Sequence, residues 1–489
     1  MGHPHPHGDG SGGTSKREME PVRPARLRQA HMEVRCARGG QGLYIKCLYV
    51  YRAFTEPHGI LMTQPTTKTA KETTNDLDRL SDLVKKAATA GADAADAVMF
   101  TGEAVSASQR MGTPEKVERS ESADIGLRVI RNQRQAVVST TDFSPAAMDE
   151  LVGRAMAMAD TVPEDPYCGL ADPEQLTIRI PDLDLDDPQT PATEVLVERA
   201  KILEEAACAV AGITNSEGAE ARWIRSRVAL AASNGFAGGY TSTRHSVIVE
   251  VLAGEGLDME RDYEYRSCIY GGDLEDMEAL GRSAGERAVR RLGPRKMATA
   301  RIPVVFDPRV ANSLVAHLAS AANGMSIARG TSFLKKKMGK KILPKDITIA
   351  DDPRRPRGVR SRAFDGEGLA SERRAMVEKG VLKSWFLDLS SARQLGLEST
   401  AHATRGTSAP PGPSASNLYM EVGTASPEEL RGDIGEGLYV TEMMGSGLNL
   451  VTGDYSRGAG GFLIENGELG HAVSEITIAG NLRDMFANL

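Results

Sequence analysis

The residues with the clearest potential for chemistry lie in a glycine-rich stretch near the C-terminus. Six glycines fall between Gly445 and Gly461, and polar side chains stand among them. Glycine-lined strands expose backbone N–H and C=O groups, to which an extended peptide can add as a further strand. The stretch therefore predicts a peptide-binding site formed by Thr452, Gly453, Asp454, Tyr455, Arg457 and Gly460. In the alternative interpretation, Asp454 and Arg457 pair with each other or cap turns.

The histidines do not form a catalytic or metal-binding pattern. Beyond residue 7, no histidine has another within five residues, and the sequence holds no HExxH, GxSxG or Walker signature. His317 lies on a predicted helix at 309–323, where its neighbours are mainly Ala, Leu and Ser. Zinc needs three or four ligands. We therefore expect no catalytic residue and no metal ligand in this chain, although a fold that joined His402 to His471 would reopen the question.

The glycine-rich stretch precedes a predicted β-hairpin. Apolar and polar residues alternate over 462–464 and again over 473–478, and Asn466-Gly467 lies between them. Asn-Gly is the favoured pair for a two-residue hairpin turn. The region 298–489 should be a large, mostly-β C-terminal domain with flanking helices, built on a sheet or partial barrel.

Two smaller domains are predicted ahead of it. A small N-terminal α/β domain at 76–160 would hold a helix capped by Asn75 or Asp76, a hairpin around Asn132-Gln133 and a helix beginning at Ser144-Pro145. A Pro/Asp-rich linker follows at 161–189. A middle α+β domain at 190–297 would place helices at 190–211 and 274–292 around strands at 219–224, 227–232 and 245–252. The predicted fold class is α+β.

The first 61 residues differ from the rest of the chain. They are rich in His, Pro and Gly, and hold nine lysines and arginines against five acids. We interpret residues 1–61 as a disordered or misassigned extension, with Met62 as the natural start. A transit peptide is the weaker alternative, because the segment carries acids and lacks amphipathic helix spacing.

Composition limits the partners of this 489-residue chain. Its 66 acids exceed its 59 bases, for a net charge of −7, which disfavours nucleic acid as a partner. No segment has the ~20 apolar residues of a membrane span. Five scattered cysteines indicate neither disulfides nor a zinc knuckle. We expect a cytoplasmic protein without a membrane partner. The basic runs 335–341 and 354–362 indicate solvated loops, the second with a docking patch for an acidic partner as the alternative.

Several longer motifs resemble those of one protein family. They are VTGDYSRGAGGF at 451–462, IENGE at 464–468, EITIAGNLRDMF at 475–486, RGTSF at 329–333, FDGEG at 364–368 and VLKSWFLDLSSARQLG at 381–396. On these motifs the chain resembles the TldD/PmbA family of metalloprotease subunits, on the PmbA (TldE) side, from Asp76 to its C-terminus. The resemblance implies a similar layout of a small N-terminal, a middle and a large C-terminal domain.

The resemblance also implies a function. The family's active subunit carries His-Glu, three residues, then His on a helix that binds zinc, and helix 309–323 is the corresponding place here. The resemblance therefore implies a PmbA-like subunit of a heteromeric zinc metalloprotease, itself without the zinc motif, paired with a TldD-type zinc subunit that holds the cofactor. The complex would act in proteolysis of unfolded or precursor peptides. The alternatives are a stand-alone homodimeric peptide-binding scaffold and a self-sufficient hydrolase with an unfamiliar site.

Overall fold

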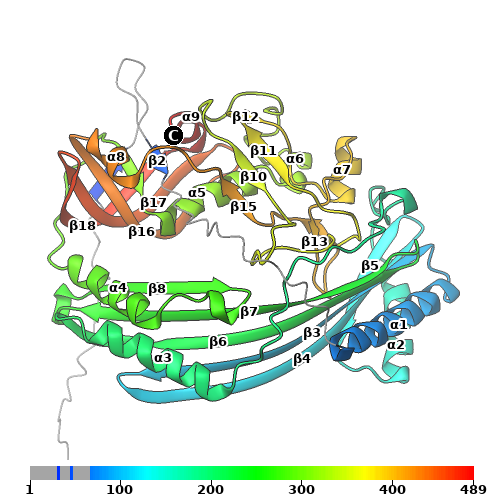
Figure 1. Cartoon of the computed structure of the whole chain (residues 1–489). Coiled ribbons are helices and arrows are strands. Elements are labelled where there is room, and N and C mark those ends of the chain that lie inside the picture. The colour runs from blue at the N-terminus through cyan, green and yellow to red at the C-terminus, as the bar shows by residue number, and fades with distance from the viewer. Residues whose placement is uncertain (1–29, 34–44, 48–66) are drawn as a thin grey trace, which may run out of the picture.

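The computed structural model describes residues 30–33, 45–47 and 67–489 (Figure 1). The predicted extension at 1–61 therefore lies mostly outside the described residues. Two short strands within it are described, β1 (Ala30–Glu33) and β2 (Ile45–Cys47). In the part of the chain that the structure describes, no helix is long and apolar enough to cross a membrane.

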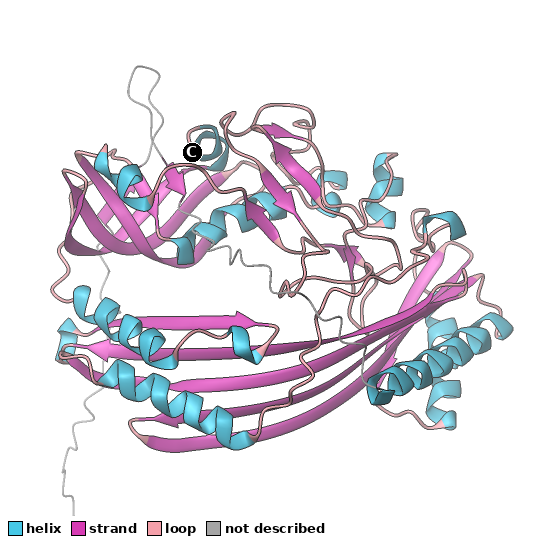
Figure 2. Ribbon diagram, viewed as in Figure 1, coloured by secondary structure: helices cyan, strands magenta, loops and turns pink. Residues whose placement is uncertain are grey.

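A long, curved antiparallel sheet forms one half of the molecule, in the order β5-β4-β3-β6-β7-β8 (Figures 1 and 2). Its strands are β3 (Ala94–Arg110), β4 (Thr113–Arg131), β5 (Arg134–Thr140), β6 (Ile213–Ala232), β7 (Ala237–Ala253) and β8 (Glu260–Cys268). Because β3 pairs with β6 from Asp96 to Gln109, one sheet runs through the predicted N-terminal and middle domains. The predicted domain limits stay predictions.

Four helices cover one face of this sheet: α1 (Thr67–Thr89), α2 (Pro145–Ala159), α3 (Thr193–Cys208) and α4 (Met277–Arg290). The alternation of β3 explains why. Ala97 and Met99 pack in the core with α1 and α2, while Val105 and Ala107 pack in the core with α3 and α4. Val98 points to the opposite face, where it packs with Phe364 of the C-terminal region. Parts of both faces of the sheet are therefore buried, one under the helices and the other under the C-terminal region.

Several predicted boundaries were wrong. The predicted strands 219–224 and 227–232 are parts of β6, because the residues between them are half-buried and hide the apolar alternation. Helix α1 begins at Thr67, so Asp76 lies within it and pairs with Arg227 at 2.6 Å. The caps and turns were predicted better. The Ser144 hydroxyl accepts a hydrogen bond from Ala147 N–H at the start of α2, and Asn132-Gln133 turns β4 into β5.

The C-terminal region contains a second six-stranded sheet, in the order β1-β18-β17-β16-β9-β2. Its strands from this region are β9 (Val304–Phe306), β16 (Glu436–Leu448), β17 (Asp454–Glu465) and β18 (Glu468–Asn481). The predicted hairpin is confirmed, since Asn466 and Gly467 both have positive φ, as a type I′ turn requires, and join β17 to β18.

A smaller sheet, in the order β12-β11-β10-β15, lies beside the second sheet. It consists of β10 (Ile349–Asp351), β11 (Arg374–Glu378), β12 (Val381–Leu382) and β15 (Leu418–Met420), and a separate pair joins β13 (Ala403–Thr404) to β14 (Gly412–Pro413). The prediction of a strand at 381–389 was wrong beyond Leu382. Trp385, Phe386 and Leu387 are consecutive buried residues that fill the core but belong to no strand.

Five helices flank these sheets: α5 (Pro308–Ala321), α6 (Gly324–Ala328), α7 (Leu389–Leu395), α8 (Pro427–Gly432) and α9 (Leu482–Ala487). Three single 3₁₀ turns complete the elements of the described residues, at Pro173–Gln175, Gly256–Asp258 and Gly271–Asp273. The predicted α+β class is confirmed. Apart from α5, which has 14 residues, the helices around the C-terminal sheets are short, with 5 to 7 residues.

Candidate functional site

The helix in which a metal site was sought begins as its sequence predicts. Asp307 caps α5 by accepting a hydrogen bond from Arg309 N–H at 2.9 Å, and Pro308 occupies the first helical position. The helix ends at Ala321. Gly324, the predicted stop, instead opens α6, which is capped by Asn323.

One face of α5 lines a cavity of about 580 Å³. The opposite face is apolar and buried in the core. The cavity face of α5 bears mainly small or polar residues at helical spacing, namely Asn312, Val315, Ala316, Ala319 and Ser320, and Asn323, the cap of α6, follows them. Such residues leave room beside the helix and offer hydrogen bonds, which are two properties of a binding site.

A segment at 413–419, which bends at Ser416 and Asn417, forms the facing wall of the cavity. The Asn323 side chain donates to the Pro413 carbonyl at 2.8 Å, and Arg360 donates to the Ala415 carbonyl at 3.1 Å. The segment runs into β15, which is the end strand of its sheet within the described part of the chain. A helix facing an edge strand across a cavity suits an extended peptide, because a sheet edge can hydrogen-bond a peptide backbone.

The cavity is positively charged. Arg355, whose guanidinium lies 5.9 Å from the ring centre of Tyr419, and Arg360 line it, and no carboxylate does so among its described lining residues. The predicted arginine patch at 354–362 is thus divided. Arg357 pairs with Asp184 at 2.6 Å, whereas Arg355 and Arg360 line the cavity.

The donor set of α5 does not fit zinc. His317 is its one histidine, and its ring packs edge-on against Tyr455, with 5.8 Å between ring centres. Burial and the nearby Arg457 charge lower the pKa of His317. Among the residues that the structure describes, no group of three His, Cys, Asp or Glu side chains is arranged to hold a metal ion.

The two other histidines considered as ligands are not joined. His402 is buried, with Nε2 3.2 Å from Asp351 Oδ2 and Nδ1 2.8 Å from Thr400 Oγ1. These contacts order a loop inside the protein. His471 lies on β18, in the six-stranded C-terminal sheet.

The first half of the predicted peptide-binding site is a tight turn between β16 and β17. Thr452 donates its hydroxyl proton to the Asp454 carboxylate at 2.6 Å, and the Asn481 amide donates to the same side chain at 3.1 Å. These two hydrogen bonds lower the pKa of Asp454. Gly453 has a φ of +88° and lies against Asn481, so the turn itself requires glycine.

The second half lies on β17. Tyr455 is 2% exposed, and Arg457 donates from Nε to the Gly445 carbonyl at 2.9 Å. Gly460 is opposite Glu442 in the ladder. Because β17 pairs with β16 on one side and with β18 on the other, a peptide cannot add directly to it. The six residues thus extend from the turn along β17, none of them lines the α5 cavity, and their binding role stays a prediction.

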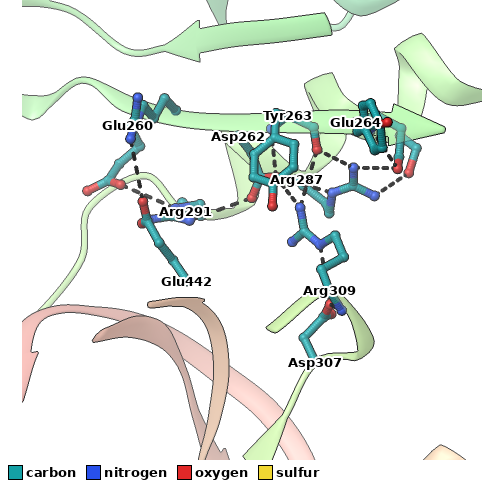
Figure 3. A network of polar contacts seen from close by, with 12 residues as sticks. Glu260, Asp262, Tyr263, Glu264, Arg287, Arg291, Asp307, Arg309 and Glu442 are labelled. Atoms are coloured by element: carbon teal, nitrogen blue, oxygen red, sulfur yellow. Dashed lines mark hydrogen bonds and ion pairs between the residues drawn. The ribbon is translucent and has the colours of Figure 1, made fainter. Parts of the chain in front are cut away.

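A network of charged side chains joins the large sheet to the base of α5 (Figure 3). Asp262 of β8, 4% exposed, lies 2.6 Å from Arg309, 3.4 Å from Arg287 and 3.6 Å from Arg291. Arg309 also contacts the cap residue Asp307 at 3.2 Å. The network therefore fixes the N-terminal end of α5, and with it one wall of the cavity.

Arg291 extends the network to the second sheet. Its guanidinium hydrogen-bonds Glu442 of β16 and lies 3.4 Å from Glu260 of β8. Burial raises the pKa of Glu260. The sequence analysis missed these residues, because Asp262 meets arginines 25 to 47 positions away and Arg291 meets Glu442 across 151 positions. It also missed the cavity face of α5, for which the spacing of Asn312, Ala316 and Ser320 was an available signal.

Comparison with known proteins covers most of the chain. Three models described as PmbA/TldA metallopeptidase domain 1, central domain and C-terminal domain match residues 95–159, 186–292 and 299–489. The chain is 40% identical to the metalloprotease PmbA of Escherichia coli O157:H7, over 81% of this chain and 86% of that protein. It is 35% identical to a metalloprotease PmbA homolog of Haemophilus influenzae, over 84% and 89%.

Solved structures share the fold. A Bacteroides thetaiotaomicron protein described as a candidate modulator of DNA gyrase aligns with a TM-score of 0.78 and 28% identity, over 84% of this chain and 92% of that one. TldE from Thermococcus kodakarensis aligns with a TM-score of 0.75 and 20% identity, over the same shares.

Proposed function

The chain belongs to the PmbA/TldA metallopeptidase family, and we propose that it is a non-catalytic, peptide-binding subunit of a heteromeric zinc metalloprotease. Its partner would be a zinc-bearing relative of the TldD type, which supplies the metal and activates water. The substrates would be unfolded or precursor peptides, and the complex would act in the cytoplasm.

One observation carries the proposal. Helix α5 keeps an open face on a cavity, yet that face bears Asn312, Ala316 and Ser320 where a zinc helix needs imidazole and carboxylate groups. A cavity of this kind can hold a chain but cannot activate water. Its edge strand and two arginines favour an extended peptide with a carboxylate, either at its C-terminus or on an acidic side chain.

The test reconstitutes the chain with a zinc-bearing family member from the same source. Zinc content and cleavage of an unstructured acidic peptide are measured for each chain alone and for the mixture. We expect cleavage in the mixture only, with zinc following the partner. Zinc and cleavage in this chain alone would refute the proposal. Peptide binding without cleavage in any mixture would favour the homodimeric scaffold instead.

A cavity variant tests the role of α5. Ala316→Trp fills the cavity, and we expect it to weaken peptide binding by at least about tenfold, since the volume next to the helix is lost. Ala88→Trp is the matched control, because Ala88 is an exposed alanine on helix α1, away from the cavity. Equal peptide binding by the two variants would remove the cavity from the mechanism.

A further inference from the structure

Strand β4 has an unpaired outer edge. Strand β5 pairs only with Ile125 to Arg131 of β4. No strand of the described chain pairs with that edge between Thr113 and Asp124. An open edge of this length presents backbone N–H and C=O groups for pairing with another chain.

The two faces of this part of β4 are open as well. Residues 113–122 are all exposed. The core beneath α3 and α4 contains buried residues of β3, β6 and β7, and none from the described part of β4. Val117 is 55% exposed although it pairs with the buried Ala107 of β3. This half of β4 therefore forms a solvent-exposed edge of the sheet.

The charges of the open edge complement themselves. The sequence Glu115-Lys116-Val117-Glu118-Arg119 alternates in sign on either side of a central valine. When it is aligned antiparallel with a second copy about Val117, each Lys116 faces Glu118, each Glu115 faces Arg119, and the two valines meet. Opposite charges and β-branched pairs are the favoured cross-strand neighbours.

Other registers are less favourable. A register centred on Glu118 would oppose the two copies of Glu118 and would set Glu115 against Glu121. The β3–β4 ladder shifts register between Ser108 and Gln109, which leaves Glu115 at a bulge. The Lys116–Glu118 pair, inside the regular stretch, is thus the contact that defines the alignment.

The ion pairs that these side chains make within one chain compete only weakly with contacts across an interface. Lys116 lies 2.6 Å from Glu118 of the same strand, with both side chains more than half exposed, and Arg119 lies 2.5 Å from Glu103. Exposed ion pairs contribute ~0–1 kcal/mol. They can be exchanged for contacts across an interface at little cost.

We propose that two copies of this chain associate edge to edge through β4, antiparallel about Val117, and so form one continuous sheet. In Figure 1 β4 forms the lower margin of the large sheet, away from α5. The interface therefore leaves the α5 cavity open.

Sedimentation of the full chain over a concentration series tests this association. We expect a monomer–dimer equilibrium, and Lys116→Glu should raise its dissociation constant about tenfold, because it creates two like-charge pairs in each dimer. Lys116→Glu combined with Glu118→Lys should restore the dimer. Lys85→Glu, on an exposed residue of α1, should leave it unchanged. Thermal melts of each variant separate loss of association from loss of folding.

Oxidative crosslinking fixes the register. Only a residue on the twofold axis meets its own copy, so Val117→Cys should form a reducible dimer and Ser120→Cys should not. A monomer at all concentrations, a dimer indifferent to Lys116→Glu, or a dimer that the charge swap fails to restore would overturn the proposal. Crosslinking by Ser120→Cys and not by Val117→Cys would overturn the register.

Discussion

Arg291 offers the most direct test of how the two halves of the molecule are held together. Its side chain is 10% exposed and faces three carboxylates, those of Glu260, Asp262 and Glu442. The change Arg291→Met keeps much of the length and the apolar stem of the side chain but removes its charge. Asp262 retains two other arginines after the change, whereas Glu260 and Glu442 lose their closest cation.

Removing one partner of a buried ion pair typically costs about 3–5 kcal/mol, because the remaining charge stays buried without compensation. We expect about 3 kcal/mol for Arg291→Met, at the lower end of that range, since Asp262 keeps its other partners. The loss falls on contacts between β8 and β16. The C-terminal sheets should therefore unfold at a lower urea concentration than the large sheet.

The two tryptophans make this measurable. Trp223 lies on β6 in the large sheet, and Trp385 lies in the C-terminal core. Single-tryptophan variants, Trp223→Phe and Trp385→Phe, report urea unfolding of each half by fluorescence. The control is Arg261→Met, whose side chain is 62% exposed and lies 3.9 Å from Glu442, for which we expect a change below about 0.5 kcal/mol.

The pH dependence gives an independent check. Burial raises the pKa of Glu260, so the folded state favours its protonated form. The stability contributed by this group is present below its unfolded pKa and is lost as pH rises through the folded value. Without the Arg291 charge the pKa should rise further, and the penalty of Arg291→Met should shrink between pH 8 and pH 5. A penalty under about 1 kcal/mol, or one equal at both pH values, would refute this account.

Two further outcomes are expected from urea unfolding. Burial and the neighbouring Asp365 raise the pKa of Glu367, so Glu367→Gln should be tolerated near neutrality. As pH rises through that pKa, the unmodified chain should lose more stability than the variant, and an equal loss in both would contradict the assignment. Gly281→Ala should destabilise the chain by about 2 kcal/mol, because the new Cβ would lie 2.2 Å from the Leu203 carbonyl oxygen where α4 crosses α3. An unchanged urea midpoint would show that the two helices adjust freely.

The sequence predicted those features that are determined by a few adjacent residues. The turn at Asn466-Gly467 needs positive φ at both positions, and the cap at Ser144 needs a hydroxyl next to a proline. Both requirements are local, so they can be recognised without knowledge of the rest of the fold. The helices of the large sheet could be predicted for the same reason, although α1 began earlier than its supposed cap.

Long-range pairing could not be predicted in this way. The register of β3 on β6 depends on which apolar faces meet across more than a hundred residues, and no local pattern encodes it. The same limit applies to the cavity, whose second wall at 413–419 carries no signal that it faces α5. Glycines such as Gly461 were interpreted as open backbone, but an added Cβ there would lie 2.0 Å from the Tyr439 carbonyl oxygen. They serve close packing between strands.

The pairing of β3 with β6 also has a consequence for synthesis on the ribosome. When β3 and β4 have emerged, about 100 further residues must be synthesised before β6 is complete and can pair with the inner edge of β3, which takes on the order of ten seconds at ordinary rates of translation. During that interval the inner edge of β3 has no partner strand. Contacts so distant in sequence also slow folding. We therefore expect the nascent chain to require chaperone protection until β6 has docked.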